Sequence, residues 1–153
     1  MDGGYLRKIT RSDYKIAVCD DSAADMEYIQ TLVREWAGER SVQIKGFPSA
    51  EAFLFQYEEE KDFDILLLDI EMAEMDGVSL ARRIRRENTA VQIVFITGYS
   101  DYIADGYDVE ALHYLLKPVK KEQFFQVLDR DNDYLRKRLV GNFGLRAAKR
   151  IES

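Results

Sequence analysis

Short apolar runs alternate along this chain with longer segments whose apolar residues recur every three or four positions. The spacing of three and four is that of one helix face, whereas short unbroken runs are typical of strands buried on both faces of a sheet. The expected strands are Ile16–Cys19, Val42–Phe47, Ile65–Leu68, Ile93–Ile96 and Tyr114–Leu116. Each strand is followed by a segment that favours a helix, which gives five strand and helix units.

The expected helices begin at capping residues or shortly after a proline. Ser22, with Asp25 three positions later, has the pattern of a capping box before the first helix, whose apolar face runs from Met26 to Trp36. The other helices are expected over residues 49–57, 78–86, 99–108 and from shortly after Pro118 to Leu135. Strict alternation requires crossover connections, so the predicted fold class is α/β, with a five-stranded parallel sheet flanked by helices on both faces.

The composition supports one folded domain. The chain has 153 residues, of which 46% are hydrophobic, and this suffices for a single core. No apolar run approaches the length of a membrane span and the start has no apolar signal region, so we expect a cytoplasmic protein without a membrane segment. Cys19 is interpreted as a small buried hydrophobe. The expected boundaries are an N-terminal extension over 1–13, a folded domain over 14–131, and the end of the last helix with a basic linker or tail over 132–153.

The net charge of -6 is unevenly distributed. Residues 135–153 carry six basic and one acidic side chain, so they contribute +5, and the remaining chain contributes -11. This acidic body argues against nucleic-acid binding by the chain itself, and the basic tail is interpreted as a linker. A solvated surface also explains an acidic excess, so only acids in particular places indicate chemistry.

Polar residues follow four of the expected strands where they end. Asp20 and Asp21 follow the first strand, Asp69 the third, Thr97 ends the fourth, and Lys117 follows the fifth. Because ligand sites of open parallel sheets lie beyond the carboxyl ends of the strands, these side chains are expected at one edge. Clustered carboxylates repel one another unless a cation intervenes.

The chemistry of this set favours a metal and a phosphoryl group. Oxygen ligands without a His cluster or Cys pair suit Mg²⁺ rather than zinc. Lys117 and Thr97 are suited to phosphate oxygens. No glycine-rich phosphate loop occurs in the chain, so a phosphoryl group carried on the protein itself is indicated.

Over about residues 14–131 the chain resembles the receiver domain of two-component response regulators, which has a (βα)5 flavodoxin-like fold. The resemblance rests on Asp20 and Asp21, on LLLDIEMAEMDG around Asp69, on FITG, and on YLLKP before residue 119. Each motif is weak alone, but their joint occurrence in this order is specific. The Tyr-rich segment between Thr97 and Lys117 is further similar to receivers that precede a LytTR-type DNA-binding domain.

The resemblance implies a phosphoacceptor that assists its own phosphorylation and dephosphorylation and is not otherwise an enzyme. Asp69 would take the phosphoryl group from a histidine kinase, with Asp69, Lys117 and Thr97 as the catalytic residues. Mg²⁺ would be held by Asp20, Asp21, Asp69 and the backbone carbonyl of Glu71.

The resemblance also implies a switch made by Thr97 and Tyr114. Thr97 would close on the phosphoryl group and Tyr114 would turn inward, which changes the surface of the fourth helix, fifth strand and fifth helix. A homodimer through this surface is implied. If the chain derives from a LytTR-type regulator, its DNA-binding output domain would lie in a longer parent, because too few residues follow the fifth helix for such a domain. A plain core role for Tyr114 stays open.

Two departures and two alternatives accompany this interpretation. Ala73 stands where the family usually has Pro, which is expected to loosen the loop, and the Glu71 side chain leaves the phosphate lifetime open. A receiver-like interaction module that is independent of phosphorylation is one alternative. The other is a haloacid-dehalogenase-type phosphatase, but that family places its nucleophile after the first strand with a second Asp two residues later, whereas Asp69 follows the third.

Overall fold

A computed structural model describes residues 14–98 and 113–135 of the chain, and in these ranges strands and helices alternate as expected. The strands are β1 (Tyr14–Cys19), β2 (Val42–Phe47), β3 (Ile65–Leu68), β4 (Gln92–Thr97) and β5 (His113–Leu116). The helices are α2 (Ala23–Ala37), α3 (Ala50–Tyr57), α4 (Gly77–Arg85) and a last helix over residues 121–135. The helix expected over residues 99–108 lies outside the described residues.

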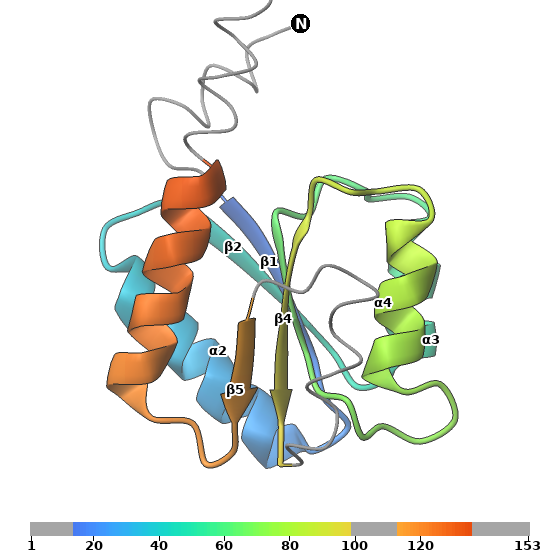
Figure 1. Ribbon diagram of the computed structural model, residues 1–153, viewed down its shortest axis with the longest axis horizontal. Coiled ribbons are helices and arrows are strands. Elements are labelled where there is room, and N and C mark those ends of the chain that lie inside the picture. Colours follow the sequence, from blue (N-terminus) through green and yellow to red (C-terminus); the bar gives the residue numbers. More distant parts are fainter. Residues whose placement is uncertain (1–13, 99–112, 136–153) are drawn as a thin grey trace, which may run out of the picture.

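All five strands form one parallel sheet in the order β2-β1-β3-β4-β5. Helix α2 and the last helix cover one face of the sheet, and α3 and α4 cover the other (Figure 1). The predicted five-stranded parallel sheet with helices on both faces is therefore confirmed. In the described parts of the chain, no helix is long and apolar enough to span a membrane.

Short polar side chains start three of the helices. Ser22 accepts a hydrogen bond from the backbone N–H of Asp25, Ser49 does so from Ala52, and Asp76 from Ser79. Each bond satisfies one of the N–H groups that a helix start leaves without a partner. Because each cap comes soon after a strand, all three helices begin at the carboxyl edge of the sheet.

The core has two halves, one on each face of the sheet. In β3, Leu66 and Leu68 pack with the α3 and α4 side, whereas Ile65 and Leu67 pack with the α2 side. All four are buried, as expected for a strand covered on both faces. Cys19 is fully buried in the first half, which confirms its interpretation as a small hydrophobe.

Backbone hydrogen bonds continue the sheet for one residue beyond three strand ends. The N–H groups of Asp20, Asp69 and Lys117 donate to the carbonyl groups of Phe47, Cys19 and Thr97, at 3.1, 2.9 and 2.8 Å. These bonds fix where the polar side chains leave the sheet. The carboxyl edge therefore presents them side by side on a rigid frame.

Candidate functional site

Three carboxylates meet at the carboxyl edge of the sheet. Asp20, Asp21 and Asp69 each offer one oxygen atom, and these atoms all lie within 4.8 Å of one another. Asp20 and Asp69 are buried, while Asp21 is exposed. The structure thus brings together the acids that the sequence placed after β1 and β3.

Hydrogen bonds orient the two acids that follow β1. Asp20 Oδ1 accepts from the backbone N–H of Ser22 at 2.8 Å, and Asp21 Oδ2 accepts from the backbone N–H of Ala73 at 3.3 Å. A proline at position 73 has no N–H and could not make the second bond. The departure from the family pattern at Ala73 thus ties the loop after β3 to Asp21, which differs from the loosening expected from the sequence.

The Lys117 ammonium lies among three carboxylates. Its Nζ atom is 2.9 Å from Asp20 Oδ2, 2.8 Å from Asp25 Oδ2 and 3.5 Å from Asp69 Oδ2. Burial alone would lower the pKa of Lys117, but the hydrogen bonds to Asp25 and Asp20 and the charges of Asp69 and Asp20 raise it. Lys117 is therefore held fully charged at the edge of the acid cluster.

Sequence reasoning missed the contact between Asp25 and Lys117. The sequence pattern assigned Asp25 to a capping box. Its place four positions after Asp21 was the only sign in the sequence of a further carboxylate near the site.

The pKa of Asp69 is raised to about 6. Burial is the main cause and the charge of Asp20 adds to it, whereas Lys117 and a hydrogen bond from the Glu71 backbone lower the value. The charge of Lys117 thus does not fully offset the rise in the pKa of Asp69 that burial and the charge of Asp20 cause. A hard divalent cation fits this donor set, because it would relieve the remaining repulsion through oxygen ligands.

The start of α4 packs directly against the backbone of Asp69. A Cβ atom built on Gly77 would lie 2.2 Å from the carbonyl oxygen of Asp69, so only glycine fits. The Gly77 N–H donates to the carbonyl of Ile70 at 2.9 Å, and Glu74 in the same loop has a φ of 63°. The loop after β3 is therefore compact and carries local backbone strain at Glu74.

Thr97 and Tyr114 lie on neighbouring strands. Thr97 is fully buried at the end of β4, and its carbonyl accepts the Lys117 N–H. Tyr114 on β5 is half-buried, and its ring lies 5.2 Å from that of Phe95, centroid to centroid. This packing suits a core aromatic as well as a residue that changes position.

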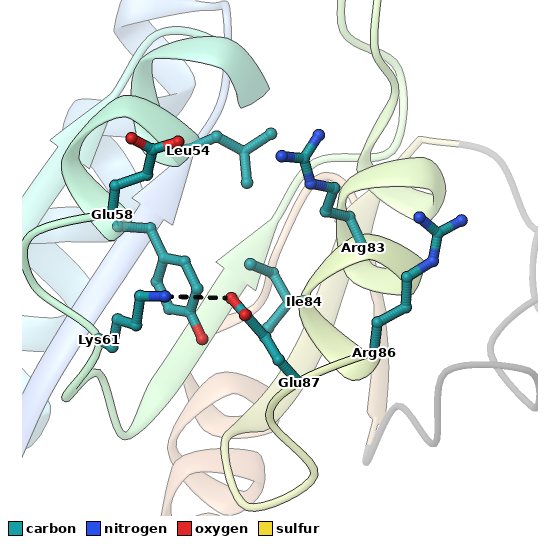
Figure 2. Close-up of a pocket in the computed structure, with 8 residues that line it drawn as sticks. Leu54, Glu58, Lys61, Arg83, Ile84, Arg86 and Glu87 are labelled. Carbon is teal, nitrogen blue, oxygen red and sulfur yellow. Dashed lines mark ion pairs between the residues drawn. The ribbon is translucent and has the colours of Figure 1, made fainter.

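A separate cavity of about 250 Å³ lies between α3 and α4 (Figure 2). Leu54 and Ile84 give it apolar walls, and Lys61 forms an ion pair with Glu87 at 3.6 Å across it. Its remaining lining residues are Tyr57, Glu58, Arg83 and Arg86. No residue of the carboxylate site lines it, and it lies where the two helices end, away from the edge where they begin.

Comparison with known proteins gives consistent results. The family model described as the response regulator receiver domain matches residues 16–129. The transcriptional regulatory protein NatR of Bacillus subtilis is 28% identical over 124 residues, which is 81% of this chain and 51% of NatR. The sensory transduction protein LytT of the same organism is 27% identical over 114 residues, 74% of this chain and 46% of LytT. The chain thus spans about half the length of these two relatives.

Solved structures agree on the fold. A receiver domain from Clostridium thermocellum superposes with a TM-score of 0.72 at 22% identity, covering 83% of this chain and 98% of that one. This likeness concerns the arrangement of strands and helices.

Proposed function

Because the chain belongs to the response regulator receiver domain family, we propose that it is a phosphoacceptor of a two-component system, with Asp69 receiving the phosphoryl group from a histidine kinase. One observation carries the proposal: the buried Asp69 carboxylate lies beside two further acids and 3.5 Å from the Lys117 ammonium. This arrangement joins a nucleophile to charges of the kind that stabilise a transferring phosphoryl group.

The chemical step is a displacement at phosphorus. An oxygen of the ionised Asp69 carboxylate forms the new P–O bond, the P–N bond of the phosphohistidine breaks, and its electron pair returns to the imidazole nitrogen. Because its pKa is about 6, Asp69 is mostly ionised at neutral pH and can act as the nucleophile. Lys117 neutralises charge on the phosphoryl oxygens, and the rigid strand ends position the reacting groups.

Asp20, Asp21 and Asp69 are the proposed side-chain ligands of Mg²⁺, together with the backbone carbonyl of Glu71. When bound, Mg²⁺ supplies positive charge beside the phosphoryl oxygens. Two observations support this assignment: the three carboxylates converge within 4.8 Å, and the charge of Asp20 helps to raise the pKa of Asp69.

Thr97 and Tyr114 are the proposed switch. Thr97 would hydrogen-bond the phosphoryl group, and Tyr114 would follow it inward, altering a surface through which two copies pair. Their neighbouring places on β4 and β5 and the contact between Tyr114 and Phe95 support this coupling.

The wider setting extends the proposal. The receiver occupies residues 14–131, with an extension before it and the helix end and basic linker after it. In this proposal the chain works in the cytoplasm and does not itself bind nucleic acid, and a DNA-binding output domain would lie in a longer parent. The similarity to NatR, a transcriptional regulatory protein, and to LytT, a sensory transduction protein, supports such a parent.

Incubation with Mg²⁺ and acetyl phosphate, followed by intact mass spectrometry, tests the proposal. The unmodified chain should gain one phosphoryl group, whereas Asp69→Asn should gain none because the amide is not a nucleophile. A chain that gains no phosphoryl group and binds no beryllofluoride would overturn the proposal and favour a phosphorylation-independent interaction module.

A further inference from the structure

The carboxylate nearest to the Lys117 ammonium is not that of the proposed acceptor. Lys117 Nζ lies 2.8 Å from Asp25 Oδ2 but 3.5 Å from Asp69 Oδ2. The Asp25 contact has the length of a strong charge-assisted hydrogen bond, whereas the Asp69 contact is a longer ion pair. Asp25 therefore competes directly with the acceptor for the same cation.

The start of α2 explains why the Asp25 carboxylate is available. In a complete capping box this side chain would accept from the N–H of Ser22. Here Ser22 Oγ accepts from the Asp25 N–H at 3.3 Å, but the Ser22 N–H donates to Asp20 Oδ1 at 2.8 Å. Of the two bonds of a capping box, only the one from the Asp25 N–H to Ser22 Oγ is formed. The Asp25 carboxylate does not bond to the Ser22 N–H and bonds to Lys117 instead.

The exposed fraction of the side chain decreases from Asp25 through Lys117 to Asp69. The Asp25 side chain is 47% exposed, Lys117 is 22% exposed and Asp69 is 8% exposed. The ammonium thus has an outer partner in Asp25 and an inner one in Asp69. A phosphoryl group on Asp69 would meet this ammonium from the inner side.

We propose that Asp25 is a positioning residue that holds the Lys117 ammonium on the outer side of the site until a phosphoryl group on Asp69 competes for it. This inference rests on the proposed function. During the change, Lys117 Nζ exchanges its hydrogen bond to Asp25 for one to a phosphoryl oxygen, and no covalent bond or proton is transferred. Because the hydrogen bond between Lys117 and Asp25 is lost in this exchange, Asp25 raises the free energy of the phosphorylated state relative to the unphosphorylated one.

Asp25→Asn tests this role because it keeps the shape of the side chain and removes its charge. Its neutral amide holds an ammonium more weakly than a carboxylate does, so we expect beryllofluoride, with Mg²⁺ present, to bind roughly threefold to tenfold more tightly. Lys117 should then lie closer to Asp69, so Mg²⁺ alone should bind about twofold more weakly. Tighter binding of one ligand and weaker binding of the other is a pattern that simple loosening of the fold does not produce.

Glu27→Gln is the matched control. It removes one negative charge from an exposed position on the same helix, and the ion pairs of Lys117 within the described residues are with Asp20, Asp25 and Asp69 and not with Glu27. Isothermal titration calorimetry on the full chain would measure both affinities in each variant. The proposal is overturned if Asp25→Asn leaves beryllofluoride affinity unchanged or lowers it, or if Glu27→Gln raises it equally.

A double-mutant cycle separates this inference from the proposed function. In chelator, the unfolding equilibria of Asp25→Asn, Lys117→Met and the double variant should show a coupling of roughly threefold or more. Coupling in a chain that neither accepts phosphoryl groups nor binds beryllofluoride would defeat the proposed function and leave a purely structural pair. No coupling in a chain that does accept them would defeat the role of Asp25 alone.

Discussion

Two buried carboxylates, Asp69 and Asp131, both have a pKa that burial raises, yet their surroundings differ. Asp69 lies at the carboxyl edge beside Asp20, Asp21 and Lys117, and its pKa is about 6. Asp131 is fully buried on the last helix with a pKa of about 8, and burial is the only cause. Within residues 14–98 and 113–135, neither oxygen of Asp131 accepts a hydrogen bond.

Burial of an acid does not by itself make a site. Asp131 sits between Leu128 and Leu135 on the apolar face of its helix, and that part of the helix lies towards the amino edge of the sheet (Figure 1). Among the residues that the structure describes, no cation forms an ion pair with Asp131, and its pKa of about 8 favours the protonated form at neutral pH. At Asp69, Lys117 and the Glu71 backbone lower the pKa against the effect of burial, and the resulting value of about 6 is compatible with its proposed role as a nucleophile.

Phosphorylation of the chain should require Asp69 and should not require Asp131. Asp131→Asn should gain one phosphoryl group from acetyl phosphate at close to the unmodified rate, because the residue lies far from the carboxyl edge, whereas Asp69→Asn gains none. Intact mass against time measures both. If folded Asp131→Asn also fails to react, the contrast between a chemical acid and a structural one is wrong.

Stability should respond to Asp131→Asn more strongly than to any other change considered. The folded pKa of about 8 lies above the ordinary value of 3.8, so the stability present below about pH 4 is lost as pH rises towards 8. An uncharged amide avoids this loss, so the variant should gain on the order of 4 kcal/mol at pH 7 and almost nothing at pH 4.

Urea unfolding of both proteins between pH 4 and 8 measures this effect. Glu122→Gln, which alters an exposed acid at the start of the same helix, serves as the control and should change the pH profile little. A gain that is equal at pH 4 and pH 8 would show that Asp131 is not protonated in the folded chain.

Most of the fold could be predicted from the sequence because burial on both faces leaves an unmistakable pattern. The runs Ile65–Leu68 and Ile93–Ile96 became β3 and the interior of β4, and Ser22 and Ser49 cap their helices as their positions suggested. Asp131 is not evident from the apolar periodicity, because that pattern marks only the apolar members of its helix face. An acid seven positions after Phe124 and three after Leu128 was the available signal.

The site was predictable as far as backbone topology determines it. Strand ends place Asp20, Asp69 and Lys117 at one edge, and the sequence shows where strands end. The contact from Lys117 to Asp25 and the bond from Ala73 to Asp21 depend on side-chain directions and on a loop's path. Neither follows from spacing along the chain.

Backbone packing against Asp69 gives the next largest effect. Gly77→Ala would bring a Cβ atom to 2.2 Å from the Asp69 carbonyl oxygen, so either α4 or the loop after β3 must shift, at a cost of about 2 kcal/mol. Gly98→Ala is the control, because a Cβ there has no neighbour within 4 Å. Thermal unfolding compares them, and equal melting temperatures would contradict the close approach at Gly77.

The smallest effect concerns Asp69 without metal. Its folded pKa of about 6 lies above the ordinary value of 3.8, so its ionisation destabilises the fold as pH rises from about 4 to 6. In chelator at pH 7.5, Asp69→Asn should therefore unfold with about 1 kcal/mol more stability than the unmodified chain, after allowance for solvent screening. Added Mg²⁺ should stabilise the unmodified chain more than the variant and reverse their order, because the proposed metal ligand is missing from the variant. A variant that melts lower in chelator would mean that the ion pair with Lys117 outweighs burial and repulsion, and Asp69 would then differ from Asp131 in the sign of its contribution as well as in its partners.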